Sequence, residues 1–290
     1  MNLNIDNSRF LITGSAGQLG KAFQDILSKK GVTIFAPAEG EFDITSGENI
    51  GAVIEKTKPD VLINCAAYNA VDKAEDEPDR AFAVNAAAAG NLAGICKEKN
   101  IFFVHYSSDY VFDGLKKTPY SEADKPHPLN IYGASKLEGE RQVQLAGGKY
   151  LIFRLSWVFG EGRQNFLYKL REWVKGKTEI SIASDEVSAP TYTYDVVDMT
   201  LKALAADLKG LYHLVNSGMA SRYELAKHFF SKAGIDIQVH AVKAENFRTK
   251  TNRPYFTAMS NKKLEAALGV KIPEWEDAVL RFLGMEKEKS

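Results

Sequence analysis

The sequence predicts an α/β protein with a doubly wound parallel sheet and a smaller C-terminal lobe. The first half of the 290-residue chain alternates short, continuous apolar runs with longer stretches of helical pattern. Continuous apolar strands separated by helices are typical of a parallel sheet that is covered on both faces. A glycine-rich turn over residues 14–20 directly follows the first apolar run. Together these observations indicate a Rossmann-type arrangement.

Five apolar runs are predicted as the strands of this sheet. Most are rich in β-branched or aromatic residues, and Pro59 and Asp60 announce the third run. The predicted strands are 10–13, 32–35, 61–64, 101–106 and 150–155. The stretches 18–30 and 78–99 are long enough for helices, and a further helix is predicted to run from Tyr132 towards Leu145.

The pattern changes after Trp157. Helical segments become shorter, and Pro190, Pro254 and Pro273 interrupt them. We therefore expect a first domain over 1–157 and a smaller, substrate-binding lobe over 158–290. Within the lobe, the segment 188–205 is expected to return to the first domain.

Charge and composition disfavour several classes of protein. Lys plus Arg and Asp plus Glu each number 37, so nothing in the net charge suggests nucleic acid or an anionic membrane as a partner. Cys65 and Cys96 form no C-x-x-C pattern, which predicts two reduced thiols. No stretch approaches the ~20 apolar residues of a membrane span, so we expect a cytoplasmic protein.

Gly14, Gly17 and Gly20 open the first predicted helix. Glycine permits a tight turn and close approach of the backbone to a pyrophosphate, to which the helix N-terminus offers free N–H groups. The spacing is G-x-x-G-x-x-G rather than the usual G-x-G-x-x-G. A plain turn would also explain the glycines, but the preceding strand and the following helix favour a dinucleotide-binding domain over 1–157.

The end of the second strand usually determines the choice between NAD and NADP. An acid there accepts a hydrogen bond from the ribose 2′-OH, whereas an Arg accommodates a 2′-phosphate. Residues 36–40 include Glu39 and no Arg. Glu39 is equally explained as a solvated side chain, and Asp43 and Ile44 are better candidates for the adenine end. The sequence alone does not decide between NADH and NADPH.

Small and polar residues stand at the ends of the third and fourth strands. Ala66, Ala67 and Tyr68 follow the third strand, where small side chains let a cofactor lie across the sheet, although ordinary packing explains them as well. Ser107 and Ser108 end the fourth strand. Ligands of such sheets bind at the carboxyl ends of the strands, so we expect these hydroxyls to point into that crevice.

Tyr132 and Lys136 are predicted to form a catalytic pair. Residues four apart lie on one face of a helix, so both side chains can act on one site. A free tyrosine has a pKa of about 10, and a neighbouring ammonium lowers it by favouring the phenolate. Tyr-x-x-x-Lys is common by chance, but here it follows a glycine-rich turn and a strand-end serine, which favours a reductase.

These motifs together resemble the extended short-chain dehydrogenase/reductase family, whose members act on nucleotide sugars. The resemblance covers nearly the whole chain. Its most specific segments are 17–20, 66–75, 107–114, 132–136, 154–159, 189–191 and 253–254.

The resemblance implies reduction of the C4 keto group of a dTDP-linked sugar, with hydride from NADPH, which is slightly favoured, or from NADH. Tyr132 would give a proton to the C4 oxygen. Lys136 would hold the nicotinamide ribose and lower the pKa of Tyr132, and Ser108 would hydrogen-bond the carbonyl oxygen. The implied cofactor-binding residues are Gly14, Gly17, Gln18, Leu19, Asp43, Ile44, Ala66, Ala67, Tyr68, Tyr132 and Lys136. The implied substrate-binding residues are Asn69, Val71, Ser107, Ser108, Tyr132, Trp157, Asn165 and Arg253.

One departure from the family concerns metal binding. Some members hold magnesium at a dimer contact through a Glu two positions after the last glycine of the turn, and that position is Ala22 here. The five histidines show no H-x-x-x-H spacing, so no metal is expected. The resemblance is compatible with a homodimer, but the sequence alone does not fix the oligomeric state. Core packing of Trp157 and a surface ion pair of Arg253 stay open as simpler roles.

Two other functions are compatible with this fold. A nucleotide-sugar dehydratase or epimerase is one, but related dehydratases place Asp-Glu after the strand-end hydroxyl, and here Tyr110 follows Asp109. The other is a non-catalytic partner, because a regulatory subunit of methionine adenosyltransferase resembles these reductases. The chain retains Ser108, Tyr132 and Lys136, which favours the reductase, although retained residues do not prove turnover.

Overall fold

Six parallel strands form one central sheet in the computed structural model, which describes residues 3–38, 40–247 and 250–288. The strand order is β10-β5-β4-β3-β1-β2, and each neighbouring pair is parallel. The order reverses at β1, which has β2 on one side and β3 on the other. The strands are β1 (Arg9–Thr13), β2 (Thr33–Phe35), β3 (Val61–Asn64), β4 (Phe102–Ser108), β5 (Tyr150–Leu155) and β10 (Gly210–His213).

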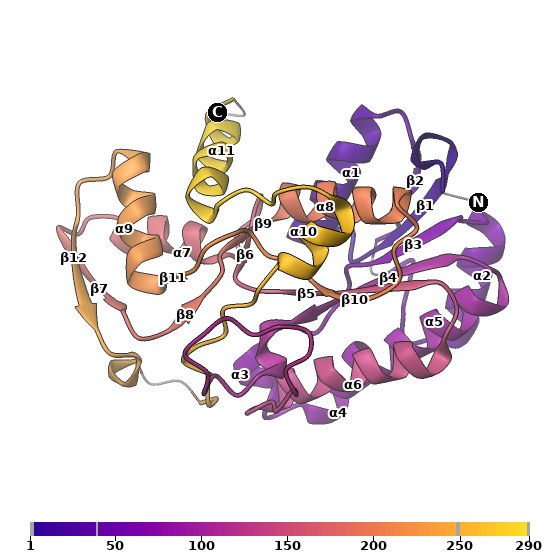
Figure 1. Cartoon of the computed structure of the whole chain (residues 1–290), viewed down its shortest axis with the longest axis horizontal. Coiled ribbons are helices and arrows are strands. Elements are labelled where there is room, and N and C mark those ends of the chain that lie inside the picture. The colour runs from indigo at the N-terminus through magenta and orange to yellow at the C-terminus, as the bar shows by residue number, and fades with distance from the viewer. Residues whose placement is uncertain (1–2, 39, 248–249, 289–290) are drawn as a thin grey trace.

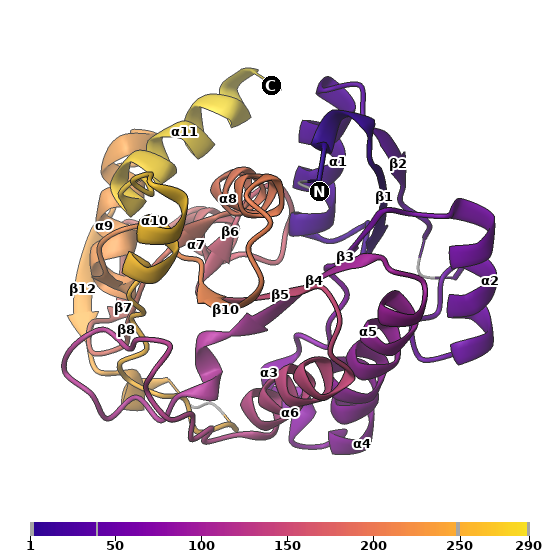
Figure 2. The same cartoon turned by 45° about the vertical axis from the view of Figure 1, so that its right-hand side comes forward.

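Helices cover both faces of the sheet, as Figures 1 and 2 show. α1, α8 and α10 pack on one face, and α2, α5 and α6 on the other. Each strand therefore buries side chains on both sides, which explains its continuous apolar run. The predicted doubly wound fold is confirmed. The helices are α1 (Gln18–Lys29), α2 (Gly47–Thr57), α5 (Ala88–Glu98), α6 (Ile131–Ala146), α8 (Thr193–Ala205) and α10 (Lys262–Leu268).

The predicted helix over 78–99 is interrupted. It divides into α4 (Pro78–Phe82), the π-helical turn η2 (Ala83–Ala87) and α5. In the turn, the Asn85 side chain accepts a hydrogen bond from Tyr68 N (2.8 Å) and donates to Tyr68 O (3.1 Å) and to Ser135 Oγ (3.0 Å). Such turns concentrate at functional sites, and this one fixes the backbone that follows β3.

The C-terminal part has an apolar cluster of its own, on the left of Figure 1. Phe159, Leu170, Phe229 and Phe282 are buried in it. No helix in the described ranges has the length and apolar character that crossing a membrane requires. The elements of this C-terminal part are β6 (Val158–Phe159), α7 (Phe166–Val174), β7 (Glu179–Ala183), β8 (Val187–Ser188), β9 (Thr191–Tyr192), β11 (Ala220–Ser221), α9 (Arg222–Ala233), β12 (Gln238–Val242) and α11 (Trp275–Glu288). Short elements elsewhere are α3 (Val71–Ala74) and the 3₁₀ turns η1 (Ile5–Asn7), η3 (Asp109–Val111) and η4 (Ala244–Asn246).

The chain crosses between the two parts more than once. After residue 157, α8 packs against α1, β10 extends the main sheet beside β5, and α10 covers β10. We propose that the dinucleotide-binding domain comprises 1–157 together with these three elements. The domain boundary near residue 157 stays a prediction, as does the return of 188–205 to the first domain. In this proposal β10 and α10 belong to the first domain as well.

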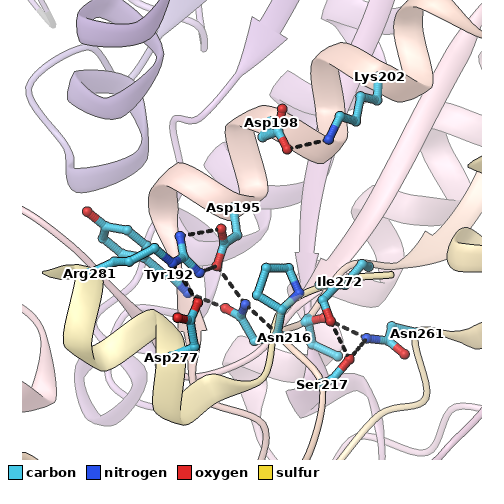
Figure 3. A network of polar contacts seen from close by, with 12 residues as sticks. Tyr192, Asp195, Asp198, Lys202, Asn216, Ser217, Asn261, Ile272, Asp277 and Arg281 are labelled. Carbon is cyan, nitrogen blue, oxygen red and sulfur yellow. Dashed lines mark hydrogen bonds and ion pairs between the residues drawn. The ribbon is translucent and has the colours of Figure 1, made fainter. Parts of the chain in front are cut away.

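A polar network joins α11 to the start of α8 (Figure 3). The Asp195 carboxylate, which is buried, accepts hydrogen bonds from both Arg281 Nη atoms (2.7 Å each) and from Asn216 Nδ2 (2.6 Å). Asn216 Oδ1 in turn accepts from Tyr192 N (2.8 Å). This network connects the C-terminal helix to the helix that packs on the sheet.

Replacing Asp195 by Ala should lower the free energy of unfolding by about 2–3 kcal/mol, because it leaves the Arg281 guanidinium and the Asn216 amide without their shared acceptor. Asp198→Ala on the same helix is the matched control. Asp198 pairs with Lys202 at the surface (2.7 Å), so its loss should cost less than about 1 kcal/mol. Denaturant titration measures both values, and equal losses would contradict the role given to Asp195.

Candidate active site

The glycine turn lies at the point where the strand order reverses. Gly14 has φ +60°, and a Cβ placed on it would stand 2.6 Å from Ala66 N, so only glycine fits between the ends of β1 and β3. Gly17 is the N-cap of α1, and no side chain caps the first amides of that helix. A bare, uncapped helix N-terminus beside small residues fits a dinucleotide pyrophosphate.

The backbone after β3 is held by a buried hydrogen-bonded chain. Thr13 Oγ1 donates to Asn64 Oδ1 (2.6 Å) and accepts from Ala66 N (3.1 Å). Asn85 holds Tyr68 on the other side. Ala66 thus lies against the glycine turn, and the hydrogen bonds at Ala66 and Tyr68 fix the backbone of this segment.

The expected adenine end of this surface is less specific. Asp43 is exposed, and its carboxylate accepts hydrogen bonds from the Thr45 amide and hydroxyl (2.8 and 2.6 Å), which lower its pKa. Ile44 buries its side chain in the core. Glu39 lies outside the described residues. Neither Asp43 nor Ile44 therefore decides between NADH and NADPH.

Tyr132 and Lys136 lie in the first turns of α6, which packs against η3, the turn that follows β4. The Asn130 side chain caps the helix by accepting from Gly133 N (2.8 Å). A Cβ on Gly133 would stand 2.2 Å from Tyr110 O, so this glycine lets α6 approach η3 closely. Ser108 is the last residue of β4 and is buried next to this contact. The fold thus brings Ser108, Tyr132 and Lys136 to one edge of the sheet.

Lys136 is almost fully buried. Its ammonium donates to Tyr106 O (2.5 Å), and burial lowers its pKa to about 8, although the Glu140 carboxylate acts in the opposite direction. A buried ammonium with such a pKa is uncommon outside functional sites.

Burial raises the pKa of Tyr132, against the opposing effect of hydrogen bonding with Ser108. This differs from the expectation that Lys136 lowers the pKa of Tyr132. Burial disfavours the charged phenolate, and this effect on the pKa of Tyr132 is larger than the opposing hydrogen bond. The Lys136 ammonium donates to the Tyr106 carbonyl oxygen. Tyr132 is therefore protonated at neutral pH, which suits a proton donor.

A cavity of about 1190 Å³ is lined mostly by residues of the C-terminal part, and its lining does not include Ser108, Tyr132 or Lys136. It connects to the pair through Arg253, which approaches the Tyr110 hydroxyl, and Tyr110 in turn contacts the Tyr132 ring. Trp157, Asn165 and Arg253 line the cavity, as does Arg222, whose guanidinium lies 4.1 Å from the centre of the Trp157 ring. Trp157 has φ +39°, a conformation that is costly for a tryptophan. Sequence reasoning gave Arg222 no role, because only the fold brings α9 to this wall.

The residues expected to bind the substrate differ in their exposure and in the partners that their side chains have within the protein. Arg253 pairs with Asp72 Oδ2 (2.7 Å) and approaches the Tyr110 hydroxyl (3.4 Å), while Asn69 is exposed and Val71 half-buried. Ser107 buries its hydroxyl without a partner among the described residues. Of these side chains, Arg253 lines the cavity, whereas Asn69, Val71 and Ser107 are not part of its lining.

Asn165 is engaged entirely with protein atoms. Its Nδ2 donates to Gly160 O (2.8 Å), Gly162 O (3.0 Å) and Gln18 Oε1 (3.0 Å), and its Oδ1 caps α7 by accepting from Tyr168 N (2.8 Å). The contact with Gln18 links the cofactor turn to the C-terminal part. A direct bond from Asn165 to the nucleotide stays a prediction and would require one of these bonds to open.

Ala22 packs in the core against α8, where the metal-binding relatives would carry a carboxylate. Within the described ranges, no group of three or more His, Cys, Asp or Glu side chains could hold a metal ion.

Comparison with known proteins places this site in a family. The sequence profile of the RmlD substrate binding domain matches residues 8–287. A dTDP-4-dehydrorhamnose reductase of Sinorhizobium fredii is 36% identical over 286 residues, which cover 95% of this chain and 96% of the relative. The chain belongs to the dTDP-4-dehydrorhamnose reductase family.

Solved structures agree with membership of the dTDP-4-dehydrorhamnose reductase family. The crystal structure of the enzyme from Bacillus anthracis in complex with NADP matches with a TM-score of 0.93 and 36% identity, covering 96% of this chain and 99% of that one. A UDP-glucose 4-epimerase from Thermus thermophilus matches with a TM-score of 0.81 at 19% identity and shares the fold. The resemblance inferred from the motifs is confirmed at the level of the family, and the roles of single residues stay predictions.

Proposed function

We propose that this chain reduces the C4 keto group of dTDP-4-dehydro-L-rhamnose to give dTDP-L-rhamnose, the sugar donor for rhamnose-containing cell-surface polysaccharide. The observation that carries the proposal is 36% identity to a dTDP-4-dehydrorhamnose reductase over 95% of the chain, with Tyr132, Lys136 and Ser108 together at the ligand-binding edge of the sheet. The homodimer and the cytoplasmic location stay predictions.

NADPH or NADH supplies the hydride in this reaction, and a relative of the family binds NADP. The bare turn at Gly14 and Gly17 receives the pyrophosphate, and the backbone of Ala66, Ala67 and Tyr68 supports the rest of the dinucleotide. Tyr132 holds the proton that the C4 oxygen takes up. Lys136, held by the Tyr106 carbonyl, presents its remaining ammonium hydrogens to the nicotinamide ribose. The cavity beside Trp157 and Arg253 receives the sugar nucleotide.

Consumption of NADPH on addition of dTDP-4-dehydro-L-rhamnose tests the proposal, with dTDP-L-rhamnose identified by chromatography and mass spectrometry. We expect one NADPH oxidised for each product molecule. An epimerase or dehydratase would convert a nucleotide sugar without net oxidation of NADPH. A folded chain that binds NADPH but turns over no substrate would instead be a non-catalytic partner.

The pH dependence of kcat/KM should report the ionisation of Lys136. Because the pKa of Lys136 is lowered to about 8, the side chain loses its charge above that pH, and kcat/KM should fall. Stability should change in the opposite direction, because the unfolded chain binds the proton up to its ordinary pKa of 10.5. This group therefore adds to the free energy of unfolding as pH rises from about 8 towards 10.5. An alkaline limb of kcat/KM that persists in Lys136→Met would contradict the assignment.

A further inference from the structure

Arg222 is held in one orientation on the wall of the cavity. It is the first residue of α9, where its backbone N–H donates to Glu186 O (3.2 Å) and its Nε donates to Glu186 Oε2 (2.6 Å). The guanidinium carbon lies 4.1 Å from the centre of the Trp157 ring and 5.0 Å from the centre of the Phe166 ring. All four residues line the cavity. Two aromatic rings and a carboxylate therefore fix the plane of this guanidinium.

The terminal nitrogens of Arg222 are left for a ligand. A guanidinium has five N–H donors, and Glu186 takes the one on Nε. Neither Nη atom of Arg222 makes a hydrogen bond to any residue that the structure describes. The side chain is 20% exposed on a wall of the cavity. A planar fork of two Nη groups matches two oxygens of a phosphate.

Arg253, by contrast, is already engaged on the same wall. Its Nη2 donates to Asp72 Oδ2 (2.7 Å), and its Nη1 approaches the Tyr110 hydroxyl (3.4 Å). A phosphate that bound the Nη groups of Arg253 would have to open these contacts, whereas Arg222 can bind an anion without breaking a bond of the protein. Lys169 and Lys177 add positive charge to the wall, and neither pairs with a carboxylate within the described ranges.

The place of Arg222 along the wall suits the middle of a sugar nucleotide. Burial raises the pKa of Tyr110, and the charge of Arg222 is the largest influence that opposes this rise. The Tyr110 ring packs against the Tyr132 ring (5.8 Å between centroids). In the other direction Phe166 contacts Trp173 (6.0 Å between centroids), which is 44% exposed. Arg222 thus stands between the neighbourhood of Tyr132 and an exposed aromatic end of the cavity.

We propose that Arg222 binds the diphosphate of the sugar nucleotide, with its guanidinium held by the two aromatic rings and the Glu186 carboxylate so that both Nη groups meet phosphate oxygens. The diphosphate joins the sugar to the nucleoside, so a ligand bound in this way directs its sugar towards Tyr132. Because the guanidinium is fixed before the ligand arrives, little side-chain freedom is lost on binding. This inference rests on the proposed reductase function.

The Kd of dTDP, measured by calorimetry, tests this contact without turnover. Arg222→Met keeps an unbranched side chain on the rings but removes the charge and the donors. It should weaken dTDP binding by about ten- to a hundredfold, the range of a hydrogen bond to a charged group. Arg222→Lys restores the charge without the planar fork and should recover part of this loss. The Kd of NADPH, which carries a diphosphate of its own, should change in neither variant.

Arg171→Met is the matched control. Arg171 also pairs with a carboxylate, that of Glu286 (2.6 Å), and lies over an aromatic ring, that of Phe229 (5.3 Å), but it is not part of the cavity lining. Its loss should leave the Kd of dTDP unchanged. Added salt should weaken dTDP binding more in wild type than in Arg222→Met, because the variant lacks one ionic contact with the ligand. A purely structural role of Arg222 would leave this salt dependence as it is.

Turnover provides a second readout. Arg222→Met should raise KM for the ketosugar nucleotide and leave kcat near the wild-type value, because the diphosphate is bound equally in the ground state and the transition state. The inference would be overturned if wild type bound no dTDP, if Arg222→Met bound it as tightly as wild type, or if Arg171→Met lost as much affinity. Wild type that bound dTDP through Arg222 but oxidised no NADPH would instead overturn the proposed function.

Discussion

Tyr132→Phe should lower kcat by about 10²–10⁴-fold, the range that general acid catalysis contributes. The burial that raises the pKa of Tyr132 keeps its hydroxyl protonated and ready to donate. Phenylalanine keeps the ring and its edge-to-face contact with Tyr110 (5.8 Å between centroids) but has no proton to give. Single-turnover oxidation of bound NADPH measures the chemical step, and titration of NADPH fluorescence should show unchanged cofactor affinity.

Tyr150→Phe is the matched control for this prediction. Tyr150 starts β5, at the opposite edge of the sheet from Tyr132, and the same loss of a hydroxyl there should leave kcat unchanged. If Tyr132→Phe turned over at the wild-type rate, another group would be the acid.

Lys136→Met should weaken NADPH binding by about ten- to a hundredfold and also lower kcat, because it removes charge-assisted hydrogen bonds from the cofactor site. Methionine is unbranched and of similar length, so it fills the space of the lysine without its charge. The readouts are the Kd of NADPH from fluorescence titration and kcat at saturating cofactor.

Stability separates this role from simple damage to the fold. A buried ammonium is costly to desolvate, and burial is the main cause that lowers the pKa of Lys136. Lys136→Met should therefore unfold at pH 7 no more easily than wild type. Lys202→Met, at the exposed pair with Asp198, is the control for both measurements and should leave both unchanged. A fall in stability that accounts for the loss of binding would contradict a functional role for Lys136.

The apolar runs of the first half predict the strands of the sheet closely, because a strand that is buried on both faces has apolar residues at consecutive positions. β3 and β5 occupy the predicted ranges, and β1 and β2 differ from theirs by one residue at their first position. The apolar run predicts β4 at 101–106, whereas the strand spans Phe102–Ser108, because polar residues at its end continue the ladder with β5. The strand β10 was missed, since a short segment after several turns carries little periodic signal.

The Tyr132–Lys136 spacing, the glycine turn and the strand-end serine are local patterns. Together with the apolar runs they predict the fold class and the family, both of which are confirmed. The position of the site that they indicate stays a prediction. The state of those groups depends on neighbours distant in the chain, which only the tertiary structure supplies. Burial, rather than the nearby ammonium, decides the direction of the Tyr132 pKa shift, and Thr257 and Ser188 meet Asp109 only because the C-terminal lobe folds back onto β4. Local spacing predicts which groups share a helix face, whereas desolvation and long-range hydrogen bonds arise from packing.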